Sequence, residues 1–164
     1  MDWGPAITGR EKTKDWQSAE WIAEKLKVDH DKPFFMMRGI SKPHLSWYVP
    51  QEYFDLYNLD SIDAPLYLED DLDDIITPEG EQKFQPSLEF LTIKENNKIK
   101  EAARAYMACV SYADDCVGLA LESLQNSKYK DNTIVVVIGD HGWHLGEKMV
   151  YRKNKSWEED CRAP

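Results

Sequence analysis

The sequence lacks any long hydrophobic run. None of its apolar stretches approaches the roughly 20 residues that a membrane-spanning helix needs. Residues 1–5 show neither the basic start nor the apolar stretch of a signal peptide. We therefore expect no membrane span, and no export signal is visible in this sequence.

Cysteine is also scarce. The three cysteines are too few and too widely spaced for a disulfide framework. Cys109 and Cys116 are seven residues apart in a predicted helix, so we interpret them as small, buried, apolar side chains. None of the three, Cys161 included, has the neighbours of a catalytic cysteine.

Basic residues are outnumbered by acidic ones, 20 against 30, which gives a formal net charge of -10. This balance disfavours nucleic acid as a partner. Carboxylates crowd residues 58–86, where no basic residue precedes Lys83. We interpret this segment as a solvated acidic loop, because its spacing does not match a calcium-binding D-x-D-x-D-G loop.

What is present indicates one globular domain with a real core: 164 residues, 42% of them hydrophobic and 12% aromatic. Apolar periodicity and β-branched runs predict helices and strands in alternation. The expected elements are helices over 15–27 (capped by Asp15), 51–57 and 94–126, and strands over 33–40 and 133–139. This order predicts an α/β fold, a sheet covered by helices.

Polar clusters follow both predicted strands, where open α/β sheets bind their ligands. Asp140 and His141 form a carboxylate–imidazole pair suited to a metal ion, and the flanking glycines let the backbone bend there. Lys153 lies in a basic cluster that could hold an anionic oxygen. His44 follows Pro43 after the first strand. Taken singly, each of these residues could instead be structural or part of a solvated surface.

Three blocks of the chain resemble the iduronate-2-sulfatase and choline-sulfatase-like branch of the type I sulfatases. They are PFFMMRGISKPHLSWYVPQEYFDLY (33–57), RAYMACVSYADDCVGLALESL (104–124) and the segment from 131 onward, which contains GDHGWHLGE. The GDHGWHLGE block is the most specific of the three.

The resemblance implies an alkaline-phosphatase-like α/β sandwich with a mixed sheet flanked by helices. It implies that Asp140 and His141 bind a divalent cation, usually calcium, although an imidazole ligand alone would suggest zinc or manganese. It implies that Lys153 contacts the sulfate group and helps the leaving oxygen depart, and that His44 is an active-site histidine. Plausible substrate contacts in the same loop are His144, Lys148 and Tyr151.

The resemblance also implies parts that this sequence lacks. The nucleophile of the family is a formylglycine made from the first residue of a C/S-x-P-x-R motif, and no such motif is present. We therefore expect 1–164 to be a single partial catalytic domain, truncated at both ends and inactive alone, with 58–86 as an acidic loop insertion. The expected partners are a sulfated small molecule or glycan and the rest of the sulfatase domain. The location of this chain stays open, although the family is commonly periplasmic or secreted.

Two alternatives remain. One is a phosphodiesterase or phosphonate hydrolase of the same superfamily, because a basic cluster does not separate sulfate from phosphate. The other is a non-catalytic remnant or binding module, which the absent nucleophile motif favours.

Overall fold

The computed structural model describes residues 1–153 and 155–163. The chain divides into two compact units. The first unit comprises Met1–Asp60 and Arg104–Val135, and the second comprises Ser61–Ala103 and Val136–Pro164. Each unit has its own buried core.

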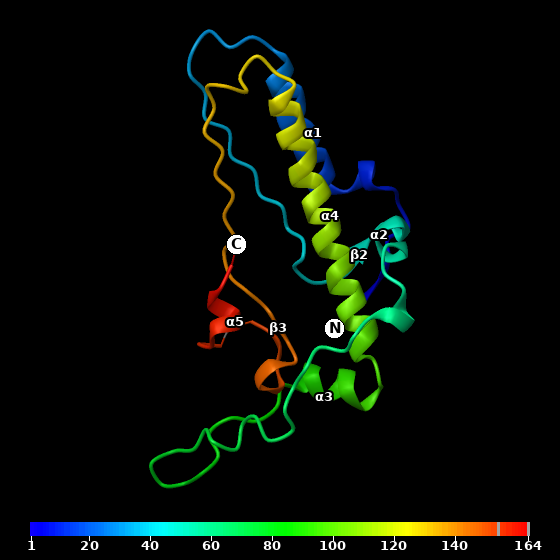
Figure 1. Ribbon diagram of the computed structural model, residues 1–164, viewed down its shortest axis with the longest axis vertical. Helices are drawn as coiled ribbons and strands as arrows, with labels where there is room; N and C mark the ends of the chain where they lie inside the picture. Colours follow the sequence, from blue (N-terminus) through cyan, green and yellow to red (C-terminus); the bar gives the residue numbers. More distant parts are fainter. Residues whose placement is uncertain (154, 164) are drawn as a thin grey trace. The chain divides into compact units, whose positions relative to one another are not determined.

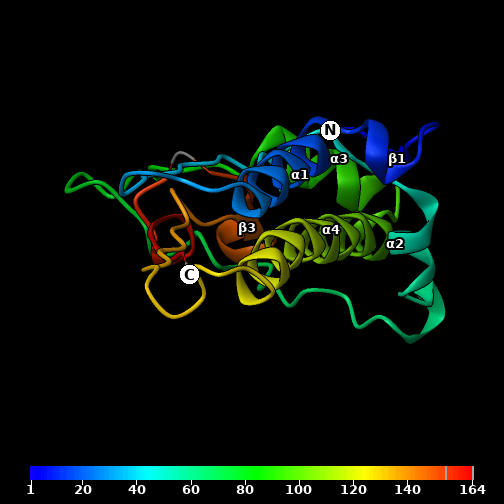
Figure 2. The same cartoon turned by 90° about the horizontal axis from the view of Figure 1, so that it is seen from above.

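The first unit is built from helices and one small parallel sheet. Its elements are β1 (Trp3–Pro5), η1 (Arg10–Lys12), α1 (Lys14–Lys27), β2 (Trp47–Val49), α2 (Gln51–Asp55) and the greater part of α4 (Ile99–Gln125). Strands β1 and β2 pair in parallel, with Trp3 opposite Trp47. Helices α1 and α4 lie side by side in both views (Figures 1 and 2).

One apolar face of each long helix is buried, which is why these segments are helical here. On α1 the buried face includes Ala19, Ala23 and Leu26. On α4 it includes Cys109 and Cys116, both 0% exposed. The helix predicted over 15–27 and the burial of these two cysteines are therefore confirmed.

The second unit packs a short helix against a hairpin. Its elements are η2 (Leu59–Ser61, which straddles the boundary), α3 (Leu88–Glu95), the first turn of α4, β3 (His144–Leu145), η3 (Glu147–Met149), β4 (Tyr151–Arg152) and α5 (Glu158–Cys161). Strands β3 and β4 are antiparallel, with His144 opposite Arg152. Phe90 of α3 lies beside the ring of Tyr151 with centroids 6.4 Å apart, and both side chains are fully buried.

The helix predicted over 94–126 is wrong at its start. The chain forms α3, breaks at residues 96–98 and then begins α4. The Ser87 hydroxyl caps α3 by accepting from the backbone N–H of Phe90 at 3.1 Å. Asn97 adopts a left-handed φ of 53°, which ends the α-helical hydrogen-bond ladder. Side-chain periodicity does not record such a local backbone turn.

The strands predicted over 33–40 and 133–139 are also wrong as stated. Both segments are extended, but neither is assigned to a strand among the described residues. The apolar side chains of 133–139 are exposed, Val136 by 71%, and those of 33–40 are exposed or half-buried, with Phe35 exposed by 88%. An apolar, β-branched pattern favours an extended backbone, whereas a strand also needs a hydrogen-bonded neighbour. The small sheets and helices still give the broad α/β class.

Asp15 does not cap α1 as predicted. The N-cap residue is Thr13, and Asp15 lies in the first turn with its carboxylate turned to residues 41 and 42.

Among the described residues, no helix combines the length and apolar character needed to cross a membrane.

Candidate functional site

The second unit brings together three of the residues singled out from the sequence. Asp140 and His141 directly follow the segment 133–139, and Lys153 follows β4. The Lys153 ammonium lies 2.6 Å from Nε2 of His141. A carboxylate oxygen of Asp140 lies 3.5 Å from the same nitrogen. The Asp140 carboxylate and the Lys153 ammonium thus both lie next to Nε2 of the His141 imidazole.

The imidazole of His141 has a defined pattern of partners. Its Nδ1 lies 2.8 Å from the carbonyl oxygen of Gly142, so Nδ1 carries the proton and donates it there. Nε2 is then left with its lone pair, which accepts from the Lys153 ammonium. The same lone pair is what a metal ion would bind.

Gly142 allows the backbone after His141 to pass close to α5. Its backbone N–H donates to the carbonyl oxygen of Asp160 at 2.8 Å. A Cβ at this position would lie 1.8 Å from the carbonyl oxygen of Glu159, so any larger residue would push α5 away. The glycine after His141 therefore permits a close approach of two backbone segments.

Two of the expected substrate contacts are buried. His144 and Tyr151 are each 0% exposed. Nε2 of His144 faces a carboxylate oxygen of Asp160 at 3.4 Å, but neither ring nitrogen has a hydrogen-bond partner within the described part of the chain. Burial raises the pKa of the Tyr151 hydroxyl, and Glu147 raises it further. Contact with a substrate would require both side chains to become accessible.

Lys148, the third expected contact, is held by the acidic segment. Its ammonium donates to a carboxylate oxygen of Asp71 at 2.7 Å and to the Asp71 carbonyl oxygen at 3.0 Å. Its backbone N–H donates to the other carboxylate oxygen at 2.9 Å. The hydrogen bond that the Lys148 ammonium donates to Asp71 is the main reason that the pKa of Lys148 is raised.

His44 belongs to the first unit, where it is exposed on the loop before β2. The buried carboxylate of Asp15 holds this loop. It accepts from the backbone N–H groups of Ser41 and Lys42, at 3.0 and 3.1 Å, and from the Ser41 hydroxyl at 2.9 Å. The Lys42 ammonium in turn donates to the carbonyl oxygen of His44 at 3.3 Å.

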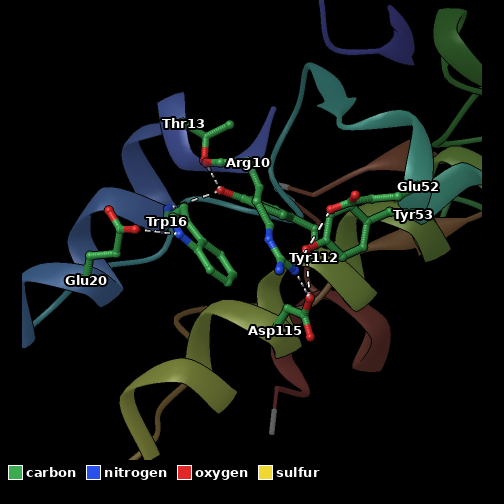
Figure 3. Close-up of polar contacts among 8 residues, drawn as sticks. All are labelled: Arg10, Thr13, Trp16, Glu20, Glu52, Tyr53, Tyr112 and Asp115. Carbon is green, nitrogen blue, oxygen red and sulfur yellow. Dashed lines mark hydrogen bonds and ion pairs between the residues drawn. The ribbon is translucent and has the colours of Figure 1, made fainter. Parts of the chain in front are cut away.

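A second polar network fixes the start of α1 in the same unit (Figure 3). Arg10 donates to Asp115 of α4 at 3.1 Å and lies 4.3 Å above the ring of Trp16. The Tyr53 hydroxyl donates to the same carboxylate at 2.7 Å. The Tyr112 hydroxyl accepts from the backbone N–H of Trp16 at 3.1 Å. These contacts tie α1, α2 and α4 together.

No group of three or more His, Cys, Asp or Glu side chains in residues 1–153 and 155–163 is arranged to hold a metal ion. Asp140 and His141 provide two ligands at most, and the Asp140 side chain is 88% exposed. Calcium takes six to eight oxygen ligands, so this pair fits as part of a cation site rather than a whole one. Lys153 beside it can bind an anionic oxygen.

The sequence alone did not point to Asp71 or Asp160. Asp71 is one of nine carboxylates in residues 58–86, and Asp160 is one of three consecutive acidic residues. Asp71 contacts Lys148, 77 residues further along the chain, and Asp160 accepts from the backbone N–H of Gly142. Residue spacing in the sequence does not reveal either contact. The apolar Leu72, between two acidic pairs, was the one sign that the tract is partly anchored.

Comparison with known proteins places these residues in a family. The sulfatase family model matches residues 5–164. A sulfatase of Formosa agariphila is 40% identical over 167 residues, which cover 99% of this chain and 32% of that protein. The iduronate 2-sulfatase of Mus musculus is 33% identical over 153 residues, covering 87% of this chain and 27% of its own length.

A more distant relative belongs to the wider superfamily. The multifunctional alkaline phosphatase superfamily protein PehA of Trinickia caryophylli is 22% identical over 172 residues, covering 92% of this chain and 32% of its own length. The chain thus spans about a third of the length of the curated relatives it matches. The resemblance inferred from the three sequence blocks is confirmed: this chain belongs to the sulfatase family.

Proposed function

We propose that this chain supplies the cation- and sulfate-facing part of an enzyme that hydrolyses sulfate esters. The observation that carries the proposal is the meeting of the Lys153 ammonium with Nε2 of His141, 2.6 Å apart, beside the carboxylate of Asp140. A cation bound at Nε2 would take the place of the Lys153 ammonium there, and the freed ammonium could bind an anionic oxygen beside the cation. The family to which the chain belongs supports sulfate as the anion.

In this proposal Asp140 and His141 are two ligands of a divalent cation, and the cation proposed is calcium. The tautomer of His141, with Nε2 free of a proton, fits a ligand. Calcium's remaining oxygen ligands would come from outside this sequence. When bound, the cation would neutralise negative charge on the sulfate group.

Lys153 would bind a sulfate oxygen and stabilise the negative charge that develops on the departing ester oxygen. His44 would be a second active-site group, presented by the loop that Asp15 holds. His144, Lys148 and Tyr151 remain candidates for substrate contact, and Lys148 has the most accessible side chain of the three. The nucleophile, a formylglycine, would be carried by sequence outside this chain.

The extended segments 33–40 and 133–139 fit the same proposal. Their exposed apolar side chains are suited to strands inside an alkaline-phosphatase-like sandwich. The partners would be strands from the rest of the sulfatase domain, because the matched relatives are about three times as long as this chain. The acidic segment 58–86 would then be an insertion in that domain.

A graft tests the proposal. This chain would replace the matching segment of the Formosa agariphila sulfatase, and turnover of an aryl sulfate would be measured. We expect the graft to be active, and Lys153→Met or Asp140→Asn to reduce turnover by roughly a hundredfold or more. Asp70→Asn, which removes one exposed carboxylate, serves as the matched control.

A folded, active graft that is indifferent to both changes would contradict the proposed roles. The likeness to PehA makes an aryl phosphate the second substrate to assay. Turnover of the phosphate that exceeds turnover of the sulfate, and that depends on Lys153, would favour phosphate ester hydrolysis instead.

A further inference from the structure

The acidic tract of the second unit is anchored at two adjacent residues. Across residues 69–74 the side chains are exposed except those of Asp71 and Leu72. Leu72 is 2% exposed and belongs to the core. The side chain of Asp71 is 18% exposed and points to Lys148 rather than to solvent. Its neighbours keep the solvated character expected of an acidic loop, so Asp71 has a separate role.

Asp71 holds Lys148 by both its main chain and its side chain. One carboxylate oxygen accepts from the Lys148 backbone N–H, and the other accepts from the ammonium. Lys148 has φ 53° and ψ 28°, a left-handed conformation that side-chain-bearing residues rarely adopt. The charge-assisted, two-point contact with Asp71 stabilises this conformation.

Lys148 lies in the turn that joins β3 to β4. β3 begins at His144, three residues after His141, and β4 ends at Arg152, directly before Lys153. The pairing of His144 with Arg152 therefore decides how far Lys153 lies from His141. In a hairpin, the conformation of the turn fixes this register.

We infer that Asp71 is a positioning residue: by clamping Lys148 in the hairpin turn, it fixes the register that places the Lys153 ammonium against the imidazole of His141. The inference rests on the proposed function only for the roles of the two residues, which are cation binding by His141 and sulfate binding by Lys153. The acidic tract thereby acquires a specific role in forming the site.

Other contacts keep the hairpin folded when the clamp is removed. The Ser87 backbone N–H donates to the Met149 carbonyl oxygen at 3.0 Å, and the Ser87 hydroxyl accepts from the Tyr151 backbone N–H at 3.2 Å. Arg152 forms an ion pair with Glu89 at 3.2 Å. Loss of Asp71 should therefore loosen the turn without dissolving the two strands.

The test uses nuclear magnetic resonance on the labelled 164-residue chain. The variants are Asp71→Asn, Lys148→Met and the two combined, with Asp70→Asn as the control that removes the same charge from an exposed neighbour. The readouts are hydrogen exchange at the Lys148 amide and the resonances of the His141 ring and the Lys153 side chain. Lys148→Arg restores a donor to Asp71 and is the rescue variant.

We expect Asp71→Asn to speed exchange at the Lys148 amide by about tenfold or more, since that amide loses a charged acceptor. The His141 and Lys153 signals should move together. Lys148→Met should shift them in the same way, the double variant should add nothing, and Lys148→Arg should return them toward wild type. Asp70→Asn should leave all of them unchanged.

Wild-type His141 and Lys153 signals in both Asp71→Asn and Lys148→Met would overturn the inference. If Asp71→Asn does not fold, Lys148→Met and Lys148→Arg decide the outcome by the same criterion. The readouts need no cation, substrate or turnover. A negative result in this experiment would therefore overturn the role of Asp71 alone. The proposed function is tested separately, by the activity of the graft.

Discussion

Among single residues, Asp15 of the first unit stands out as a buried carboxylate. It is 6% exposed and accepts from two backbone N–H groups and one hydroxyl of Ser41 and Lys42. A buried carboxylate is tolerated only when hydrogen-bond donors surround it. Asp15 thereby links the first turn of α1 to the loop that carries His44.

Asp15→Ala should lower the free energy of unfolding by about 3 kcal/mol, because two backbone N–H groups lose their acceptor. Urea denaturation followed by circular dichroism measures this. Glu24→Ala on the same helix is the control, since its ion pair with Lys27 is solvent-exposed and should contribute less than about 1 kcal/mol. Equal losses in the two variants would show that the Asp15 contacts do not stabilise the fold.

The three cysteines should differ in reactivity, because they differ in burial. Burial raises the pKa of Cys109 to about 12 and that of Cys116 to about 11, whereas Cys161 is exposed. Because the thiolate is the reactive form, the two buried thiols should stay unreactive up to about pH 9.

Iodoacetamide treatment of the folded chain, followed by peptide mass spectrometry, tests this difference. We expect labelling at Cys161 alone below pH 9, and labelling of Cys109 and Cys116 only after urea unfolds the chain. Comparable labelling of all three in the folded chain would contradict the packing of α4 described above.

At the scale of elements, the two long helices could be predicted from the sequence, apart from the start of α4, and the strands could not. The apolar faces of α1 and α4 repeat at helical spacing, and a helix satisfies its own backbone hydrogen bonds. The segments 33–40 and 133–139 have strand-like composition, but their hydrogen bonds depend on a neighbour that composition does not name. The short strands β3 and β4 were missed because each is only two residues long and their pairing is set by the turn.

Phe90 is the central side chain of α3, fully buried between Tyr67 and Tyr151, with ring centroids 5.0 and 6.4 Å away. Phe90→Ala should lower the free energy of unfolding by about 4 kcal/mol, from lost burial plus the cavity that remains. Leu88→Ala, at a position 74% exposed, should change it by less than about 0.5 kcal/mol. Urea denaturation of both variants checks the difference, and a small effect at Phe90 would contradict α3 packing on the hairpin.

For the whole molecule, the central question is how an acidic protein would bind an anion. The chain carries a formal charge of -10, so an anion must find a local basic point. Asp140, His141 and Lys153 were identified from the sequence, and the structure brings them together. Asp71 was not predicted, because its contact with Lys148 spans 77 residues and only the tertiary fold creates it.

The measurement that tests the proposed sulfate site most directly is a titration of the labelled chain with sodium sulfate, followed by nuclear magnetic resonance. Sodium chloride at matched ionic strength is the control. We predict saturable shifts of the His141 ring and the Lys153 side chain that Lys153→Met abolishes. Shifts that chloride reproduces, or that survive Lys153→Met, would contradict a sulfate site at these residues.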